Sequence, residues 1–220
     1  LFSERRVKKI MYEFFTGYET DDIRIKVITV ITMVLAYFMG NISPATIIGR
    51  IMGIDIKKEG SGNAGTTNVL RVLGAKAAVL TLAVDVLKGV AAVLIGYYAV
   101  GIPAAMLCAP SVTAGHIWPV LLRFKGGKGV ATIFGSLTAL EPLMGLTALA
   151  LVAAGAFISR RASVGSIVGA VTLPFIAWFF MPKLIVIACL LGALVLFSHR
   201  SNIIRLVKGE EPRINFGGKS

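Results

Sequence analysis

Charged residues are scarce in this sequence. Asp, Glu, Lys and Arg together make up 15% of the 220 residues, whereas hydrophobic residues make up 56%. Soluble domains usually carry about 25% charged residues, so this composition does not supply the polar surface of a soluble fold. We therefore expect an all-α integral membrane protein, whose helices satisfy their own backbone hydrogen bonds inside the bilayer.

Residues that bind metals or form disulfides are also few. The two cysteines, Cys108 and Cys189, lie in apolar runs without a CxxC or a Cys/His spacing, so we expect packed thiols and no metal site. Acidic residues number 11 against 23 Lys and Arg, which gives a net charge of +12. The cations cluster between apolar runs, which is typical of cytoplasmic loops and argues against nucleic acid as a partner.

Long apolar runs make up most of the chain. A transmembrane helix needs about 20 apolar residues, although short or paired helices can have fewer. The runs predict seven spans, at residues 27–49, 77–99, 103–122, 130–140, 142–158, 164–181 and 183–198. The last four come from two runs interrupted by "EP" and "MPK", because proline ends a helix. In an alternative with five spans, each of these two runs crosses once.

The positions of Lys and Arg predict an orientation. The basic segments at 50–76, 123–128, 160–161 and 200–213 would all lie on one side of a seven-span protein. The positive-inside rule makes that side cytoplasmic, with the C-terminus inside and the N-terminus outside, although the basic "RRVKK" near the N-terminus opposes this. We expect residues 1–25 to form a polar extension, 26–213 the transmembrane domain and 214–220 a tail.

The first polar segment is "KKEGSGNAGTTNVLR", at residues 57–71. Its glycines permit positive φ and a close approach of the backbone, and its hydroxyl and amide side chains are short donors and acceptors. With a following arginine they could form an oxyanion-binding nest at the start of a helix. The alternative is an ordinary surface loop capped by Asn68, because every loop uses such residues.

The second polar segment is "RFKGGKGVAT", at residues 123–132. It lacks the GxxxxGK[ST] pattern of nucleotide-binding loops, because Lys128 is followed by Gly129 and Val130. Lys125 and Lys128 flank a Gly-Gly pair just before a predicted helix, where a phosphate could meet two ammonium groups and free backbone N–H groups. The alternative is that these lysines only anchor the loop to lipid headgroups.

The third polar segment is "SHRSNIIRLVKGEEPRI", at the end of the last span. His199, Asn202 and Arg205 are spaced by three, so on a continuing helix they would share a face and could bind an anion or a hydroxyl group. Within the spans, Asp85 and Lys88 could pair with each other or serve function. His116 could be a buried hydrogen-bonding residue or a site residue.

Together these motifs resemble the acyl-phosphate-dependent glycerol-3-phosphate acyltransferases of bacterial membranes. The resemblance runs from about Ala36 to Arg213, and its motifs are "GSGNAGTTNVLR", "DVLKG", "GHIWPVLLRFKGGKGVAT" and "HRSNIIRL". Each motif alone is weak, but the ordered set is highly specific. It implies a seven-helix enzyme of the bacterial cell membrane, with its site facing the cytoplasm.

The implied reaction moves a fatty acyl group from acyl phosphate to glycerol 3-phosphate, which gives lysophosphatidic acid and phosphate in the first acylation of phospholipid synthesis. The resemblance implies a catalytic set of Ser61, Lys128, His199 and Asn202. It implies a substrate-binding set of Asn63, Thr67, Asn68, Arg71, Lys125, Gly126, Gly127 and Arg205. We expect no metal, no cofactor and no obligate protein partner, so the partners are the two substrates and membrane lipids.

Neither histidine is followed by an aspartate in the HxxxxD pattern of acyl-CoA-dependent acyltransferases. We therefore expect neither a His-Asp dyad nor a covalent acyl-enzyme, and the base could be His199 or a substrate phosphate. Two other functions stay open. A transporter of a phosphorylated solute would explain the ionisable residues within the spans. A scaffold would use its basic face only to hold anionic lipid.

Overall fold

The computed structural model describes residues 22–214, and these residues form helices and connecting loops without a β-strand. The helices in order are α2 (Ile23–Gly40), α3 (Pro44–Ile51), α4 (Thr66–Leu73), α5 (Ala75–Val100), α6 (Ile102–Ile117), α7 (Val130–Leu140), α8 (Pro142–Ser159), α9 (Ala162–Phe180), α10 (Ile185–Ser198) and α11 (Arg200–Val207). Two short 3-10 turns, η1 (Val120–Leu122) and η2 (Pro182–Leu184), follow α6 and α9. All but the first residue of the predicted tail, and most of the predicted N-terminal extension, lie outside the described residues.

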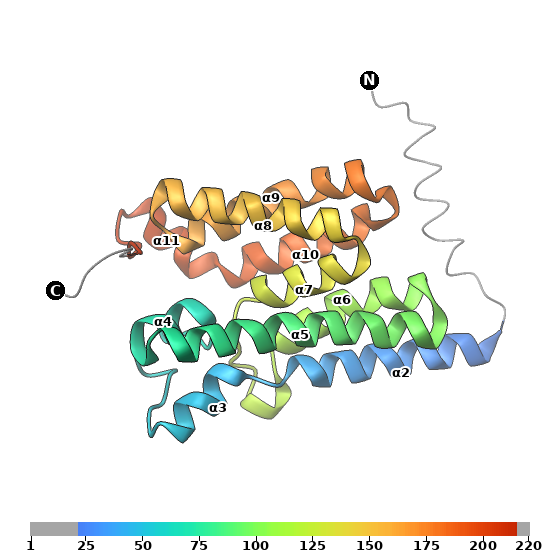
Figure 1. Ribbon diagram of the computed structural model, residues 1–220, viewed down its shortest axis with the longest axis horizontal. Coiled ribbons are helices and arrows are strands. Elements are labelled where there is room, and N and C mark those ends of the chain that lie inside the picture. Colours follow the sequence, from blue (N-terminus) through green and yellow to red (C-terminus); the bar gives the residue numbers. More distant parts are fainter. Residues whose placement is uncertain (1–21, 215–220) are drawn as a thin grey trace.

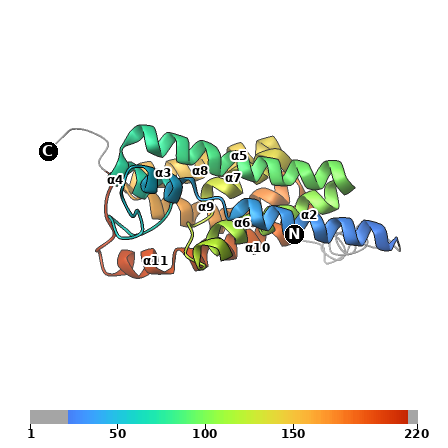
Figure 2. The same ribbon diagram turned by 90° about the horizontal axis from the view of Figure 1, so that it is seen from below.

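The long helices form an elongated bundle whose short helices gather at one end (Figure 1). In both views α3, α4 and α11 lie at that end, whereas α2 begins at the opposite end (Figure 2). The three polar segments of the sequence belong to these short helices and to the loop before α7. The topology therefore places the candidate site at one end of the bundle.

The expected spans correspond closely to the helices. Within the described part of the chain, five segments are long and apolar enough to cross a membrane, and a sixth follows if α10 and α11, bent by 60°, count as one span. The remaining expected span is α7, which has 11 residues and a length of about 16 Å. Because a hydrocarbon core is about 30 Å thick, α7 alone is too short to cross it.

The chain reverses direction at both proline-containing breaks. Glu141 caps α8 by accepting a hydrogen bond from the backbone N of Leu143 at 3.4 Å, and Pro142 is the first residue of the helix. The helices on either side of each break pack against each other, as α7 does with α8 and α9 with α10. Neither run therefore forms the single continuous helix that the five-span alternative needs.

The first span is broken between α2 and α3. Ser43 caps α3 by accepting a hydrogen bond from the backbone N of Thr46 at 3.3 Å, and Pro44 occupies the first helical position. Asn41 accepts a hydrogen bond from the backbone N of Leu121 at 3.1 Å, which ties the break to η1. The break thus turns α3 aside and also contacts the loop after α6.

Glycines set the distances between the helices. A methyl group at Gly40 of α2 would lie 2.2 Å from the carbonyl oxygen of Val112, and one at Gly115 of α6 would lie 2.0 Å from that of Tyr37. A methyl group at Gly89 of α5 would lie 2.3 Å from the carbonyl oxygen of Thr132 in α7. Small residues at such contacts let helix backbones approach closely in a membrane, where apolar burial alone drives no association.

The largest hydrophobic core lies among α7, α8, α9 and α10. Its centre includes Leu137, Met144 and Leu191, each at most 1% exposed. The outer surface of the bundle is also apolar, and Phe175 and Phe179 of α9 are 72% and 80% exposed. An apolar exterior around a packed apolar interior is the pattern of a bundle surrounded by lipid.

The contact between α2 and α6 predicts the effect of Gly115→Ala. The added methyl group must displace backbone atoms, so we expect the free energy of unfolding to fall by about 1–3 kcal/mol. Thermal unfolding in detergent measures the change. The control is Ala83→Val, which enlarges an exposed side chain in α5 and should leave the melting temperature unchanged. A Gly115→Ala protein that melts at the wild-type temperature would contradict the close contact.

Candidate functional site

The loop before α4 folds around the side chain of Asn68. Asn68 Oδ1 accepts a hydrogen bond from the backbone N of Ser61 at 2.8 Å. Its Nδ2 donates to the carbonyl oxygens of Ile56 at 3.1 Å and Glu59 at 3.0 Å. Gly60 has a φ of 58°, and a methyl group there would lie 2.3 Å from Asn68 Oδ1. Asn68, which is 1% exposed, therefore positions the loop that presents Ser61.

The glycine-rich loop before α7 lies directly on the end of α6. The backbone N of Gly126 donates to the carbonyl of Ile117 at 3.2 Å, and that of Gly127 to the carbonyl of His116 at 3.1 Å. A methyl group on Gly127 would lie 2.2 Å from His116 Nε2. Gly129, with a φ of 84°, then starts α7. Glycine is required here by close contact as well as by backbone conformation.

The helix does not continue straight through the third motif. The chain bends by 60° at His199, between α10 and α11, because His199 leaves the helical conformation with a ψ of 7°. The expectation that His199, Asn202 and Arg205 lie along one continuing helix is therefore wrong. His199 Nδ1 lies 2.9 Å from the carbonyl oxygen of Val195, to which it donates its proton. In the neutral ring the proton is therefore on Nδ1, and Nε2 is unprotonated.

Glu211 joins two of the predicted site residues. Its Oε1 accepts a hydrogen bond from Asn202 Nδ2 at 2.7 Å, and its Oε2 accepts one from Arg205 Nε at 2.8 Å. Asn202 Oδ1 in turn accepts a hydrogen bond from Lys128 Nζ. Burial acts to raise the pKa of Glu211, but the hydrogen bonds from Asn202 and Arg205 and the charge of Arg205 outweigh it and lower the pKa. The carboxylate thus stays charged and holds the third motif to Lys128.

A cavity of about 570 Å³ lies where these segments meet. Its polar wall contains most of the predicted site residues, namely Ser61, Asn63, Thr67, Asn68, Arg71, Lys128, His199, Asn202 and Arg205. Its apolar wall comes from α7 and α8 and includes Phe134, Leu149 and Val152. An apolar wall opposite a cationic one suits an amphipathic anion with a hydrocarbon tail.

A second cavity, of about 290 Å³, adjoins the first and shares Ser61, Asn63, Lys128 and Arg205 with it. The remaining predicted residues, Lys125, Gly126 and Gly127, line this smaller cavity. Every residue predicted for the site therefore lines one of the two cavities. Lys128 lies between them, so one ammonium group can contact anions on both sides.

Helix N-termini add to the positive potential that three cationic side chains create in the larger cavity. The first residues of α4, α7 and α9 line it, and no side chain among the described residues caps these helix starts. Uncapped N-terminal turns offer free N–H groups and carry about half a positive charge each. Arg71, Lys128 and Arg205 add full charges, which Glu211 balances only in part. The cavity is thus suited to binding oxyanions such as phosphate.

Desolvation changes the charge state of two residues in the cavity. Burial lowers the pKa of Lys128 from 10.5 to about 8; the carboxylate of Glu211 opposes this, and the charges of Arg205 and Arg71 add to it. Burial and the charge of Lys128 lower the pKa of His199 to about 4. At neutral pH Lys128 is therefore mainly a cation, and His199 is an uncharged hydrogen-bonding group.

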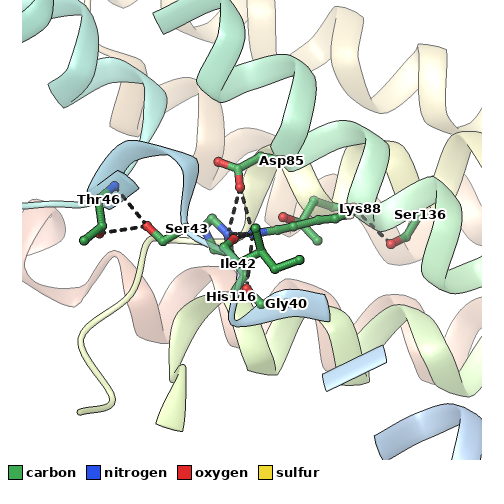
Figure 3. Close-up of polar contacts among 9 residues, drawn as sticks. Gly40, Ile42, Ser43, Thr46, Asp85, Lys88, His116 and Ser136 are labelled. Carbon is green, nitrogen blue, oxygen red and sulfur yellow. Dashed lines mark hydrogen bonds and ion pairs between the residues drawn. The ribbon is translucent and has the colours of Figure 1, made fainter. Parts of the chain in front are cut away.

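A buried polar cluster of Asp85, Lys88 and His116 contacts the glycine-rich loop on its side facing the bundle interior. Lys88 Nζ lies 2.7 Å from Asp85 Oδ1 and 2.8 Å from His116 Nδ1, and it also donates to the carbonyls of Ile42 at 2.8 Å and Gly40 at 3.2 Å (Figure 3). The Gly40 and Ile42 carbonyls belong to the break between α2 and α3. Asp85 and Lys88 therefore do pair, and His116 joins the break to the loop that holds Lys128.

Sequence reasoning missed Glu211 and left the roles of Asp85 and His116 open. Glu211 follows another glutamate in "GEEP", and no local pattern distinguishes the two. Asp85 and His116 both line the larger cavity as well as belonging to the buried cluster. Their intramembrane position was the only signal, and it did not identify their partners.

Comparisons with known proteins agree on one family. Residues 30–209 match the family model described as glycerol-3-phosphate acyltransferase. A protein of that name from Thermoanaerobacter sp. (strain X514) is 46% identical over 188 residues, covering 84% of this chain and 95% of the relative. Another, from Clostridioides difficile (strain 630), is 45% identical over 193 residues, with the same coverage of each chain.

Two solved structures share the fold. Both are crystal structures of PlsY (YgiH), an integral membrane glycerol 3-phosphate acyltransferase. The glycerol 3-phosphate form has a TM-score of 0.81 and 32% sequence identity, and the match covers 85% of this chain and 96% of that one. The lysophosphatidic acid form has a TM-score of 0.79 at the same identity, covering 85% and 95%.

The buried cluster predicts that Lys88→Met strongly destabilises the protein. The change leaves the Asp85 carboxylate and two backbone carbonyls without their cation, which should cost about 3–5 kcal/mol. Unfolding in mixed detergent micelles measures the loss, and Lys76→Met at the exposed start of the same helix is the control. Adding Asp85→Asn to Lys88→Met should restore part of the stability. Equal stabilities of the Lys88→Met and Lys76→Met proteins would contradict the proposed role of the cluster.

Proposed function

This chain belongs to the glycerol-3-phosphate acyltransferase family, and on that premise we propose that it transfers a fatty acyl group from acyl phosphate to glycerol 3-phosphate. A glycerol hydroxyl oxygen forms a bond to the acyl carbonyl carbon, and the bond between that carbon and the phosphate oxygen breaks. The products are 1-acyl-glycerol 3-phosphate and inorganic phosphate. The observation that carries the proposal is the position of Lys128 between two cavities, each of which can hold one phosphate.

The shapes of the cavities suggest which substrate each one takes. The larger cavity has an apolar wall, and a narrow apolar extension of about 50 Å³ shares Val130, Phe134 and Val152 with it. We assign the acyl phosphate to this cavity, with its chain between α7, α8 and α9. The smaller cavity is mainly polar and is lined by Lys125, Gly126 and Gly127, so it suits glycerol 3-phosphate.

Positioning and electrostatics account for most of the proposed catalysis. Lys128, Arg71 and Arg205 hold the phosphates and stabilise the negative charge that develops on the leaving group. His199, with a pKa of about 4, is too weak a base for efficient proton abstraction at neutral pH. Its Nε2 can still accept a hydrogen bond from the other glycerol hydroxyl and so orient the substrate. A substrate phosphate accepts the proton of the attacking hydroxyl.

We also propose the membrane topology expected from the sequence. Seven apolar segments form helices, and the basic loops lie with the site at one end of the bundle. The positive-inside rule supports a cytoplasmic site and C-terminus in a bacterial cell membrane, with the N-terminus outside. The buried Asp85, Lys88 and His116, which motivated the transporter alternative, pair with one another.

A donor test checks the reaction. Purified protein should convert palmitoyl phosphate and glycerol 3-phosphate to lysophosphatidic acid with release of phosphate. Arg71→Ala and Lys128→Ala should each lower kcat/KM by about 100-fold or more, because each removes a cation from a phosphate site. The control Lys76→Ala should be as active as the wild type. The proposal fails if only acyl-CoA or acyl carrier protein serves as donor, or if both cavity variants retain full activity.

The pKa of Lys128 predicts the pH dependence of the reaction. Lys128 binds phosphate as a cation, so kcat/KM for glycerol 3-phosphate should decline above about pH 8, by about tenfold per pH unit. Lys128→Arg should abolish this decline even if the rate is lower, because arginine stays charged. Lys125→Arg, in the same loop, should keep it. If kcat/KM of the Lys128→Arg enzyme still declines above about pH 8, the decline must come from the titration of another group.

A further inference from the structure

A third polar cavity lies on the other side of the glycine-rich loop. It has a volume of about 760 Å³ and is enclosed by α3, the turn after it, and the segment from η1 to the glycine-rich loop. Four cationic side chains from these separate segments line it, namely Arg50, Lys57, Arg123 and Lys125, and Asp55 is the one acid among its lining residues. The proposed reaction uses none of these residues except Lys125.

The four cations of this cavity are not neutralised by ion pairs within the described part of the protein. Among residues 22–214, none of the four forms an ion pair with a carboxylate. Asp55 Oδ1 accepts a hydrogen bond from the backbone N of Lys57 at 3.1 Å. Burial and the charges of Arg50 and Lys125 lower the pKa of Lys57, although Asp55 opposes this. The cavity therefore concentrates positive charge that an anion would balance.

The walls of the cavity are held in place. Leu121 is hydrogen-bonded through its backbone N to Asn41 at the break in the first span. Arg123 and Phe124 both have left-handed backbones, with φ of 56° and 59°, although neither is glycine. Hydrogen bonds from the backbone N of Arg123 to Val120 O and of Phe124 to Pro119 O hold this turn. An unfavourable backbone kept in place by its surroundings is often found at binding sites.

Exposed apolar side chains occur at the rim of the cavity and beside it. Leu121 of η1, which lines the cavity, is 70% exposed, and Ile51, which follows the lining residue Arg50 in α3, is 80% exposed. An exposed apolar rim beside a cationic cavity suits a ligand that carries both a phosphate and acyl chains. A free phosphate would use the cations but not the rim.

We propose that this cavity binds the phosphate of an anionic membrane phospholipid, at a site separate from the two substrate cavities. Arg50 and Arg123 contact the headgroup from opposite walls, and the acyl chains lie along α3 and η1. Lys125 lines both this cavity and the smaller substrate cavity, so the lipid phosphate lies next to the proposed glycerol 3-phosphate site.

Lipid counting tests this site without relying on the proposed reaction. Full-length protein in detergent is titrated with phosphatidylglycerol or phosphatidylcholine, and bound lipid is counted by native mass spectrometry. In Arg50→Gln/Arg123→Asn both charges are lost, and Asn tolerates the left-handed backbone at position 123. We expect the Kd for phosphatidylglycerol to rise about thirtyfold, because each basic residue contributes to binding an anionic lipid. Phosphatidylcholine should bind weakly to all forms.

The matched control is Lys76→Gln/Lys208→Gln, which removes the same charge from exposed positions elsewhere on the basic face. This control and the charge-preserving Arg50→Lys/Arg123→Lys should keep the wild-type Kd within about threefold. An equal loss of binding in the control would overturn the site in favour of general attraction to a basic surface. Unchanged binding in Arg50→Gln/Arg123→Asn would also overturn it.

Inorganic phosphate distinguishes the two sources of the anion. A large excess of inorganic phosphate should displace little phosphatidylglycerol, because phosphate cannot use the apolar rim. If inorganic phosphate instead displaces the bound phosphatidylglycerol as effectively as a soluble analogue of its headgroup does, a free anion is the ligand, and the lipid proposal fails. Transfer activity of the double variant should stay at the wild-type level, since Arg50 and Arg123 lie outside both substrate cavities.

Discussion

The ammonium group of Lys88 connects the parts of the protein on which the site depends. It supplies hydrogen-bond donors to carbonyls at the break in the first span, which no helix hydrogen bond satisfies there. It also binds His116, whose ring lies against Gly127 in the glycine-rich loop. The broken first span, the buried ion pair and the glycine-rich loop are thus connected through one side chain. This explains why a costly charge lies between apolar helices.

The two adjoining cavities depend on a balance between positive charge and the carboxylate of Glu211, since the other carboxylate in the lining, Asp85, pairs with Lys88. Three cations and several uncapped helix starts surround the larger cavity, and without a counterion they would repel one another. Glu211 holds Arg205 and Asn202 directly and Lys128 through Asn202. The Glu211 carboxylate keeps the cations close together yet leaves a net positive charge, which suits the two phosphates of the proposed reaction. The cavity is therefore organised before substrates arrive.

The sequence predicted the elements well because its signals there are local. Apolar runs and two prolines predicted helix boundaries close to those observed. Glycines with short polar or basic residues marked the first two segments of the site, and the spacing of His199, Asn202 and Arg205 marked the third. The roles of Glu211 and His116 could not be predicted, because they depend on the folded arrangement: Glu211 reaches Lys128 through Asn202, and His116 contacts Lys88. The bend at His199 was also missed, since the spacing of His199, Asn202 and Arg205 fits a straight helix equally well. Asn68 was expected to meet substrate, yet its hydrogen bonds hold the loop.

The length of α7 has a consequence for the competition between transfer and hydrolysis. Because α7 has only 11 residues, the glycine-rich loop that precedes it reaches into the bundle, beyond the end where α3, α4 and α11 lie. Acyl phosphate is a reactive anhydride, and water is the nucleophile that would waste it. In the proposed reaction the short helix would keep this anhydride away from bulk water, so its length would help to determine how much donor is transferred to glycerol 3-phosphate and how much is hydrolysed to free fatty acid.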